Sequence, residues 1–104
     1  MKRLLTAALC AAALVAGVSG VQAADPKEIK IAVIASKTGP LEAYAKQTIT
    51  GFMMGLDYAT GGTMMVAGKK LVVIEKDDQG KPDVGKAQLA AAYADDKADI
   101  AVGP

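Results

Sequence analysis

Short apolar runs alternate with helical patterns along this chain, and this alternation constrains its fold more than any other feature. The apolar runs occupy residues 29–35, 71–76 and 99–102. Between the first two, apolar residues follow the four-three spacing of one helix face, at Ala45, Ile49, Phe52, Leu56 and Ala59. Chains that alternate strand and helix form parallel sheets with right-handed crossovers. The sequence therefore predicts an α/β fold with a doubly wound parallel sheet in the order β-α-β-α-β.

Turn-forming residues mark the limits of these elements. The first run lacks polar alternation, as expected of a strand covered on both faces. Gly61 and Gly62 are expected to end the first helix, and Pro82 fits the first turn of the second. Gly51 and Gly55 lie within the first helix. Either they allow the helix backbone to approach the sheet closely, or they only reflect the glycine-rich composition of the chain. Residues 63–70 are interpreted as a loop or as a lead into the second strand.

The first 23 residues have the pattern of a signal peptide. Lys2 and Arg3 precede an apolar stretch that runs to Val18, and small residues follow as far as Ala23. This stretch is shorter than the roughly 20 residues that span a bilayer. We expect residues 1–23 to be a signal peptide cleaved near Ala23, which predicts a periplasmic location with no stable membrane insertion. A retained N-terminal anchor is the alternative.

Composition excludes several classes of chemistry. The net charge is +1, so nothing indicates a nucleic-acid partner. The chain has no histidine, and its single cysteine, Cys10, lies in the predicted signal peptide. Catalytic sets of the Ser-His-Asp or Cys-His type are therefore excluded from residues 24–104. The glycines lack the spacing of a dinucleotide or phosphate loop. The residues therefore predict no catalytic set of these types and no nucleotide cofactor.

An acidic pair, Asp77 and Asp78, ends the second apolar run. Paired carboxylates at a strand end can hold Mg²⁺. The alternative is that one aspartate caps the following turn while the other is solvated. The remaining acidic residues near the second helix are interpreted as solvated surface: Asp95, Asp96 and Asp99. The methionine pairs at 53–54 and 64–65 are interpreted as packing residues rather than thioether ligands. No metal site is predicted.

The loop after the first strand is the best candidate for a binding site. It contains Ser36 and Thr38 and leads to Tyr44 at the start of a helix. Backbone N–H groups at a helix N-terminus favour an anion, and a tyrosine offers a flat apolar surface and a hydroxyl. The alternative is an ordinary strand–helix turn in which Thr38 caps the helix.

The order of motifs resembles a known family. The set comprises "IKIAVIASKTGP" at 29–40, Tyr44, Gly51, the pair Gly61-Gly62, Gly68, "LVVIEKDD" at 71–78, Pro82 and "IAVGP" at 100–104. It resembles, over residues 27–104, the N-terminal lobe of the leucine/isoleucine/valine-binding family of periplasmic solute-binding proteins (type I fold). Within that family, the overall sequence is most similar to members from soil bacteria that capture lignin-derived aromatic acids.

The resemblance implies a two-lobed protein that closes on a small molecule and delivers it to an ABC transporter permease. It implies no enzymatic activity and no cofactor. The implied ligand is a branched-chain amino acid or an aromatic acid such as a hydroxycinnamate. Tyr44 falls where the family often places an aromatic residue beside the ligand, and Ser36 and Thr38 lie in the same loop. Ala45 stands where the family frequently has glycine, so the local turn differs. The family's main carboxylate-binding cluster would follow Pro104.

Residues 24–104 are accordingly expected to be an incomplete N-terminal part of a ligand-binding lobe, although a complete small domain is the alternative. Two other functions remain open at this point. One is a ligand-sensing domain of an exported receptor, which has the same fold. The other is a metal-dependent enzyme that uses Asp77 and Asp78.

Overall fold

The computed structural model describes residues 27–104, which form four strands and two helices. In chain order these are β1 (Glu28–Ala35), α1 (Glu42–Ala59), β2 (Met65–Val66), β3 (Lys69–Asp77), α2 (Pro82–Ala94) and β4 (Ile100–Val102). The predicted signal peptide, residues 1–23, lies outside the described part of the chain. Each predicted strand and helix is present, and Pro82 opens α2 as expected.

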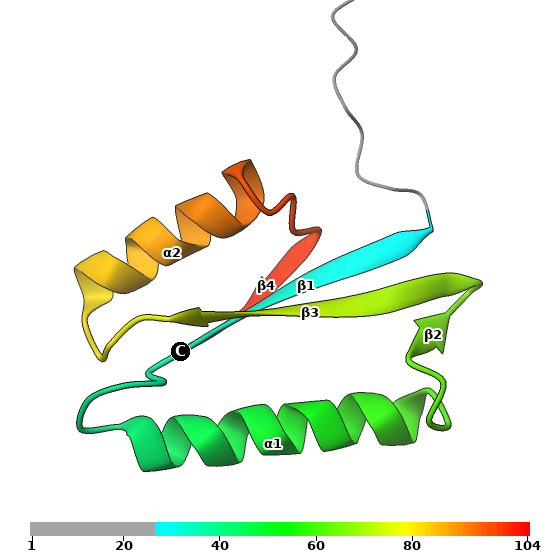
Figure 1. The fold of residues 1–104 in the computed structure, drawn as a ribbon, viewed down its shortest axis with the longest axis horizontal. Helices are drawn as coiled ribbons and strands as arrows, with labels where there is room; N and C mark the ends of the chain where they lie inside the picture. The colour runs from blue at the N-terminus through cyan, green and yellow to red at the C-terminus, as the bar shows by residue number, and fades with distance from the viewer. Residues whose placement is uncertain (1–26) are drawn as a thin grey trace, which may run out of the picture.

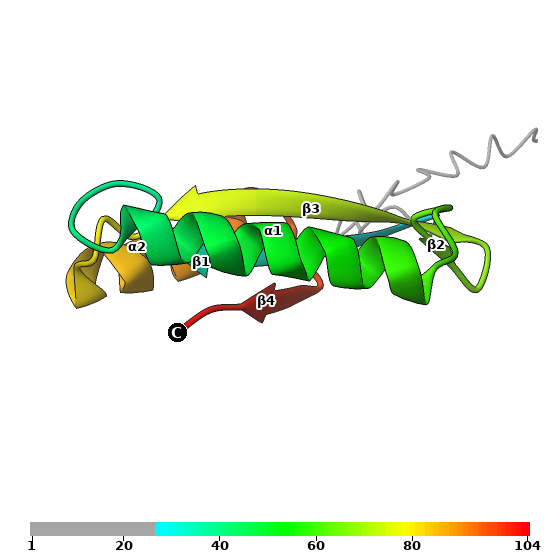
Figure 2. The same ribbon diagram turned by 90° about the horizontal axis from the view of Figure 1, so that it is seen from below.

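The strands form one sheet in the order β2-β3-β1-β4. β1 pairs in parallel with both β3 and β4. Figure 1 shows α1 on one side of this sheet and α2 on the other. Figure 2, the view from below, shows α1 lying over the sheet, with β3 and β4 at opposite sides of it. The predicted α/β architecture with a parallel sheet is confirmed.

The segment 63–70, which the sequence left open, forms a small antiparallel hairpin. β2 pairs with the first residues of β3. The turn between them has positive φ at two successive residues, 51° at Ala67 and 76° at Gly68. Two such residues in a row match the right-handed twist of the flanking strands, which favours a two-residue hairpin. The sheet is therefore mixed at this edge rather than wholly parallel.

The face of the sheet under α1 carries large side chains. Ile31, Val33 and Leu71 are buried there, and the apolar stripe of α1 packs on them through Ile49, Phe52 and Leu56. Ala45, the first residue of the predicted stripe, is buried as well. Ala59, the last, is exposed at the end of the helix, where Gly61 and Gly62 take positive φ angles of 60° and 81°. The predicted apolar stripe therefore packs on the sheet from Ala45 to Leu56.

The opposite face, under α2, has a buried cluster of small side chains, Ala32, Ala92 and Ala98. Ile34, two residues after Ala32 on the same face of β1, is buried as well. A Cβ added at Gly85 would lie 3.4 Å from the Cβ of Asp78, so the first turns of α2 lie close to the residue that follows β3. The prediction of close approach at Gly51 and Gly55 is wrong, because a Cβ at either position meets no atom within 4 Å. Both glycines lie on the exposed side of α1.

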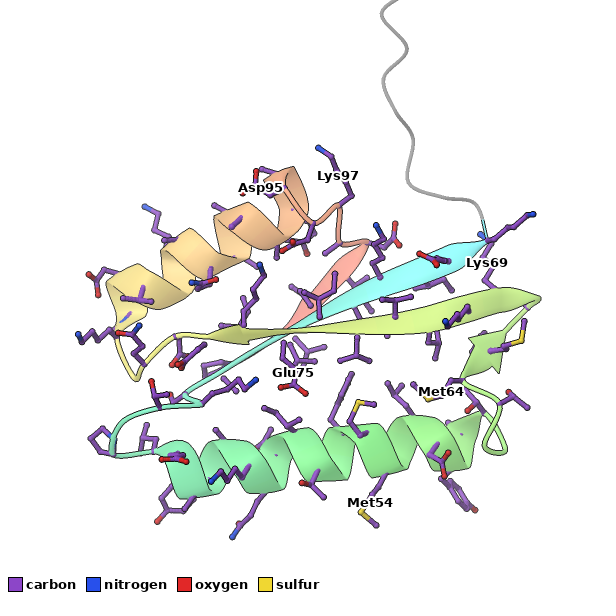
Figure 3. The ribbon with its side chains drawn as sticks, in the orientation of Figure 1. Met54, Met64, Lys69, Glu75, Asp95 and Lys97 are labelled. Atoms are coloured by element: carbon purple, nitrogen blue, oxygen red, sulfur yellow. The ribbon has the colours of Figure 1, made fainter. Side chains whose placement is uncertain are left out.

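The far end of α2 is fixed to the sheet by polar contacts. Lys76 of β3 forms an ion pair with Asp96, and both side chains are half-buried. The Asp99 N–H donates to the Lys30 carbonyl, and the Lys30 N–H donates to Asp99 Oδ2, each at 2.8 Å. The interpretation of this acidic group as solvated surface is wrong for Asp96, which is half-buried in the ion pair. Asp99 is exposed as predicted, although its carboxylate also accepts the Lys30 N–H. Asp95 is exposed and points outward in Figure 3.

The methionines are divided between core and surface. Met64 packs against the large-residue core, and Met53 is half-buried. Met54 points away from the sheet in Figure 3, and its side chain is exposed. The packing interpretation is therefore confirmed for one residue of each pair. None of the helices in residues 27–104 is long and apolar enough to cross a membrane.

Candidate functional site

The carboxyl ends of β1 and β3 lie side by side, because parallel neighbours end at the same edge of a sheet. In the register of this pair, Ala35 lies opposite Asp77. The loop that leaves β1 therefore starts beside the acidic pair that ends β3. This edge of a doubly wound sheet is where ligands bind in open α/β folds.

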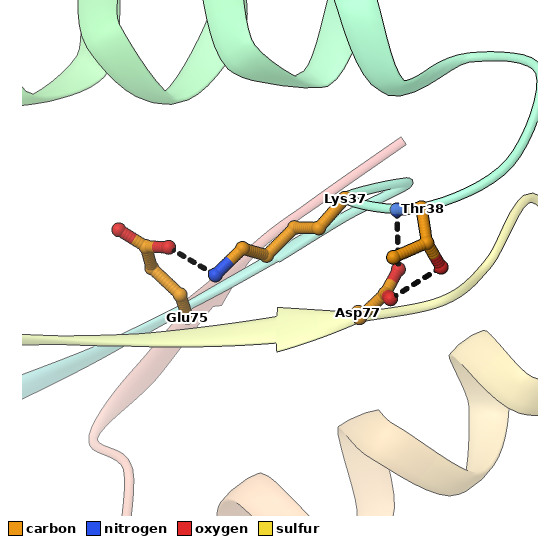
Figure 4. A network of polar contacts seen from close by, with 4 residues as sticks. All are labelled: Lys37, Thr38, Glu75 and Asp77. Carbon is orange, nitrogen blue, oxygen red and sulfur yellow. Dashed lines mark hydrogen bonds and ion pairs between the residues drawn. The ribbon is translucent and has the colours of Figure 1, made fainter.

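Asp77 holds the middle of the β1–α1 loop. Its Oδ2 accepts a hydrogen bond from the Thr38 hydroxyl at 2.7 Å, and its Oδ1 accepts the N–H groups of Thr38 at 3.2 Å and Gln79 at 2.9 Å (Figure 4). The Thr38 hydroxyl, followed by the Gln79 N–H, lowers the pKa of Asp77 below its ordinary value of 3.8. These donors stabilise the ionised carboxylate, which has more capacity to accept hydrogen bonds than the protonated form.

Lys37, in the same loop, forms an ion pair with Glu75 of β3, which lies two residues before Asp77 and therefore on the same face of the sheet. Its Nζ lies 2.5 Å from Glu75 Oε2 (Figure 4). Both side chains are more than a third exposed, so water screens the pair and its contribution to stability is small. The contact nevertheless gives the loop a second attachment on the α1 side of the sheet.

Asp78 holds the start of the loop and is buried, with 5% of its surface exposed. Its Oδ1 accepts a hydrogen bond from the Ser36 hydroxyl at 2.7 Å and another from the Gly80 N–H at 2.8 Å. Its own N–H donates to the carbonyl of Ala35 at 3.1 Å. A buried carboxylate is costly unless it is hydrogen-bonded, and these contacts supply that compensation.

The two aspartates act on opposite sides of the sheet. Successive residues of a strand point to alternate faces, so Asp77 reaches Thr38 while Asp78 reaches Ser36 and lies against Gly85 of α2. The expectation that an aspartate caps the turn is confirmed, since Asp77 and Asp78 each accept a turn N–H group. The expectation that the other aspartate is merely solvated is wrong, because both also bind the β1–α1 loop. Residues 27–104 contain no group of three or more potential metal-ligating side chains.

Thr38 does not cap α1. The N-cap residue is Leu41, and no side chain bonds to the helix N-terminus there. The Thr38 hydroxyl is instead directed to Asp77, so the alternative that Thr38 merely caps the helix is wrong.

Two neighbouring cavities open beside this loop. The smaller, of about 280 Å³, lies between the end of β1 and the first turn of α1 and includes Tyr44 and Thr48 in its lining. The larger, of about 650 Å³, lies toward α2 and includes Asp78 and Leu89. The residues common to both are Ile34, Ser36, Leu41, Val102, Gly103 and Pro104. The lining is mainly apolar with a few polar groups, which is the usual composition of a small-molecule site.

The structure brings two of the three predicted site residues to these cavities. Ser36 lines both, and Tyr44 lines the smaller one with 69% of its surface exposed. Thr38 lines neither. The sequence analysis missed Leu41, and it considered Asp78 only as a metal ligand or a turn residue. The adjacency of β1 and β3 places Asp78 beside Ser36.

Comparison with known proteins identifies the family. The family model described as "Periplasmic binding protein" matches residues 28–104, which is most of the chain. The chain belongs to the periplasmic binding protein family. No curated protein sequence matches it.

Solved structures of this family agree. An ABC transporter from Rhodopseudomonas palustris is 70% identical over 73% of this chain and 22% of its own, with a TM-score of 0.72. An ABC-type branched-chain amino acid transporter from the same organism is 67% identical over 74% of this chain and 21% of its own, also with a TM-score of 0.72. A branched-chain amino acid substrate-binding protein from Streptococcus pneumoniae, solved with isoleucine, shares the fold at 24% identity, covers 75% of this chain and 22% of its own, and has a TM-score of 0.67.

These matches confirm the predicted resemblance to branched-chain amino acid binding proteins of ABC transporters. The chain spans about a fifth of the length of the solved relatives. These relatives are ABC transporters and substrate-binding proteins rather than enzymes, and the family is extracytoplasmic.

Proposed function

We propose that this chain is part of an extracytoplasmic solute-binding protein that captures a small carboxylate-bearing ligand and delivers it to an ABC transporter permease. The observation that carries the proposal is the 67% identity, over 74% of the chain, to an ABC-type branched-chain amino acid transporter. The ligand is a branched-chain amino acid or a lignin-derived aromatic acid such as a hydroxycinnamate.

The cavities at the carboxyl ends of the strands support this function. Tyr44 offers an exposed ring at the mouth of the smaller cavity, and Leu41 and Val102 supply apolar walls. Such a surface suits the side chain or ring of the proposed ligands, since aromatic residues bury large areas at binding sites. Ser36 adds a polar group that orients the ligand.

Calorimetry on the full-length protein tests the ligand class. The titrants are isoleucine, leucine and 4-hydroxycinnamate, and we expect micromolar or tighter binding of at least one. Tyr44→Ala is expected to weaken that binding about tenfold, the scale of a lost aromatic contact of roughly 1 kcal/mol. Tyr58→Ala is the matched control, because Tyr58 is 90% exposed and lines neither cavity. Equal effects of the two substitutions would contradict a role for Tyr44.

Export is the second part of the proposal. Residues 1–23 are proposed to direct secretion and to be removed, so that the mature chain begins at Ala24. Mass spectrometry of the protein from a periplasmic extract measures its N-terminus. Recovery of an intact Met1 in that fraction would contradict cleavage near Ala23.

A further part of the proposal is that most of the ligand site lies outside residues 24–104. The chain spans about a fifth of its solved relatives, and binding proteins that close on a ligand need groups from both lobes. We expect residues 24–104 alone to bind the same titrants at least 100-fold more weakly than the full-length protein. Micromolar binding by the short segment would contradict this.

A further inference from the structure

The Ser36 hydroxyl is shared between the cavities and a buried carboxylate. Ser36 lines both cavities, and its Oγ lies 2.7 Å from Asp78 Oδ1. The same Oδ1 receives the N–H of Gly80 at 2.8 Å. A backbone N–H can only donate, so Oδ1 is an accepting oxygen. The Ser36 hydroxyl must therefore be the donor in its own contact with Asp78.

This contact determines what Ser36 can offer to a ligand. A serine hydroxyl has one proton and two lone pairs. With the proton directed at Asp78, only the lone pairs remain for a group in either cavity. Turning the proton away is unfavourable, because it would remove one of the hydrogen bonds that compensate a carboxylate with 5% exposure.

We propose that Asp78 is a positioning residue that fixes Ser36 as a hydrogen-bond acceptor, and that Ser36 thereby selects ligands that place a donor, such as an ammonium or a phenolic hydroxyl, beside it. This inference rests on the proposed function, since it names the ligand group that faces the β1–α1 loop. The carboxylate of the ligand must then lie elsewhere in the site, because it brings only acceptors to Ser36.

Two matched pairs of titrants separate the donor from the rest of the ligand. Isoleucine is paired with 3-methyl-2-oxopentanoate, which lacks the ammonium, and 4-hydroxycinnamate with cinnamate, which lacks the phenolic hydroxyl. In calorimetry on the full-length protein, the wild type should prefer the donor-bearing member of the pair that it binds. Ser36→Ala should weaken binding of that member about tenfold or more and leave its partner within about twofold.

Substitutions at Asp78 test the positioning role. Asp78→Ala frees the Ser36 proton, so the preference for the donor-bearing member should fall although Ser36 is still present. Asp78→Asn should retain the preference, since its amide oxygen can accept from Gly80 and Ser36. Ser36→Thr keeps the hydroxyl and should also retain it. Thr50→Ala removes an exposed hydroxyl on α1 and is the control. Thermal unfolding of each variant separates loss of fold from loss of selectivity.

The outcomes distinguish the inference from the proposed function. Equal weakening of both members of a pair by Ser36→Ala, or a wild-type preference for the member without the donor, would overturn the inference and leave the proposed function intact. Absence of wild-type binding to all four titrants and to leucine would overturn the proposed function itself.

Discussion

The two faces of the sheet are built from the same strands but packed in different ways. Under α1, the buried residues are Ile31, Val33 and Leu71, and the helix meets them with large side chains. Under α2, the buried cluster is Ala32, Ala92 and Ala98, and α2 packs against both β1 and β3. The core under α1 is therefore built from large side chains, whereas the buried cluster under α2 is built from alanines.

This difference teaches that a helix–sheet contact can be stabilised in two ways. Large residues bury more apolar area per side chain, and each Å² of buried apolar area stabilises the fold by about 25 cal/mol. Small residues bury less area each but leave less space between helix and sheet, and a Cβ added at Gly85 of α2 would already be in van der Waals contact with Asp78, next to the end of β3. The two faces should then respond oppositely to changes in side-chain volume. The following experiments test this contrast, from the largest expected effect to the smallest.

Removing volume should be most damaging under α1. Leu71→Ala is expected to lower the free energy of unfolding by about 2–5 kcal/mol, because a cavity remains in a buried cluster. Leu89→Ala is the matched control, since Leu89 is largely exposed on α2. Urea denaturation of the full-length protein measures both. A loss at Leu89 as large as that at Leu71 would break the proposed contrast between the faces.

Adding volume should be most damaging under α2. Ala92 has no exposed surface, so Ala92→Leu is expected to lower the free energy of unfolding by about 1–3 kcal/mol through overpacking. Ala94→Leu, at an exposed position of the same helix, should change it by no more than about 0.5 kcal/mol. If the midpoints of urea unfolding of these two variants coincide, α2 is not tightly packed.

Replacing glycine by alanine tests the same contrast between α1 and α2, with smaller expected changes in the free energy of unfolding. Gly51→Ala should raise the free energy of unfolding by about 0.5–1 kcal/mol, because the added methyl meets nothing and alanine favours the helix. Gly85→Ala should raise the free energy of unfolding by less, since its methyl group comes to 3.4 Å from the Cβ of Asp78. Thermal unfolding compares the two. A larger gain at Gly85 would contradict close packing of α2.

The β1–α1 loop is held by a hydrogen bond from Thr38 to the carboxylate of Asp77, so its stability should depend on pH. The Thr38 hydroxyl lowers the pKa of Asp77, so the stability from this contact is present above the ordinary pKa and is lost as pH falls through the lowered value. Thr38→Val should raise the pKa of Asp77 toward 3.8. NMR titration of the Asp77 carboxyl carbon measures it, and an unchanged pKa would show that Thr38 does not donate to Asp77.

The control for this titration is Thr50→Val, which makes the same substitution at an exposed position of α1. The pKa of Asp77 should stay lowered in this variant. An equal rise of the Asp77 pKa in both variants would indicate a general effect of the substitution rather than a lost hydrogen bond.

Most of the fold could be predicted from the sequence, because it depends on local patterns. The buried run of β1, the stripe from Ala45 to Leu56 and the proline at the start of α2 each dictate one element. The glycines of α1 could not be interpreted in this way. Whether Gly51 faces the sheet or solvent depends on how the helix is rotated, and packing of Phe52 and Leu56 decides that.

The candidate site was only partly predictable for the same reason. Ser36 and Thr38 could be located in one loop from the sequence, but their partners lie about 40 residues further along the chain. The acidic pair offered two local interpretations, a cap or a metal ligand. It caps the turn and also holds the β1–α1 loop, and this second role becomes visible only when β1 and β3 are paired.

The sequence by itself determined the order and type of the elements, since periodicity and turn residues act over a few residues. Only the tertiary structure decided the roles of the polar side chains. The parallel register sets Ala35 opposite Asp77, and the pleat then sends the two aspartates to opposite faces. A carboxylate whose donors come from a distant loop cannot be assigned from its neighbours in sequence, because hydrogen bonds depend on distance in space.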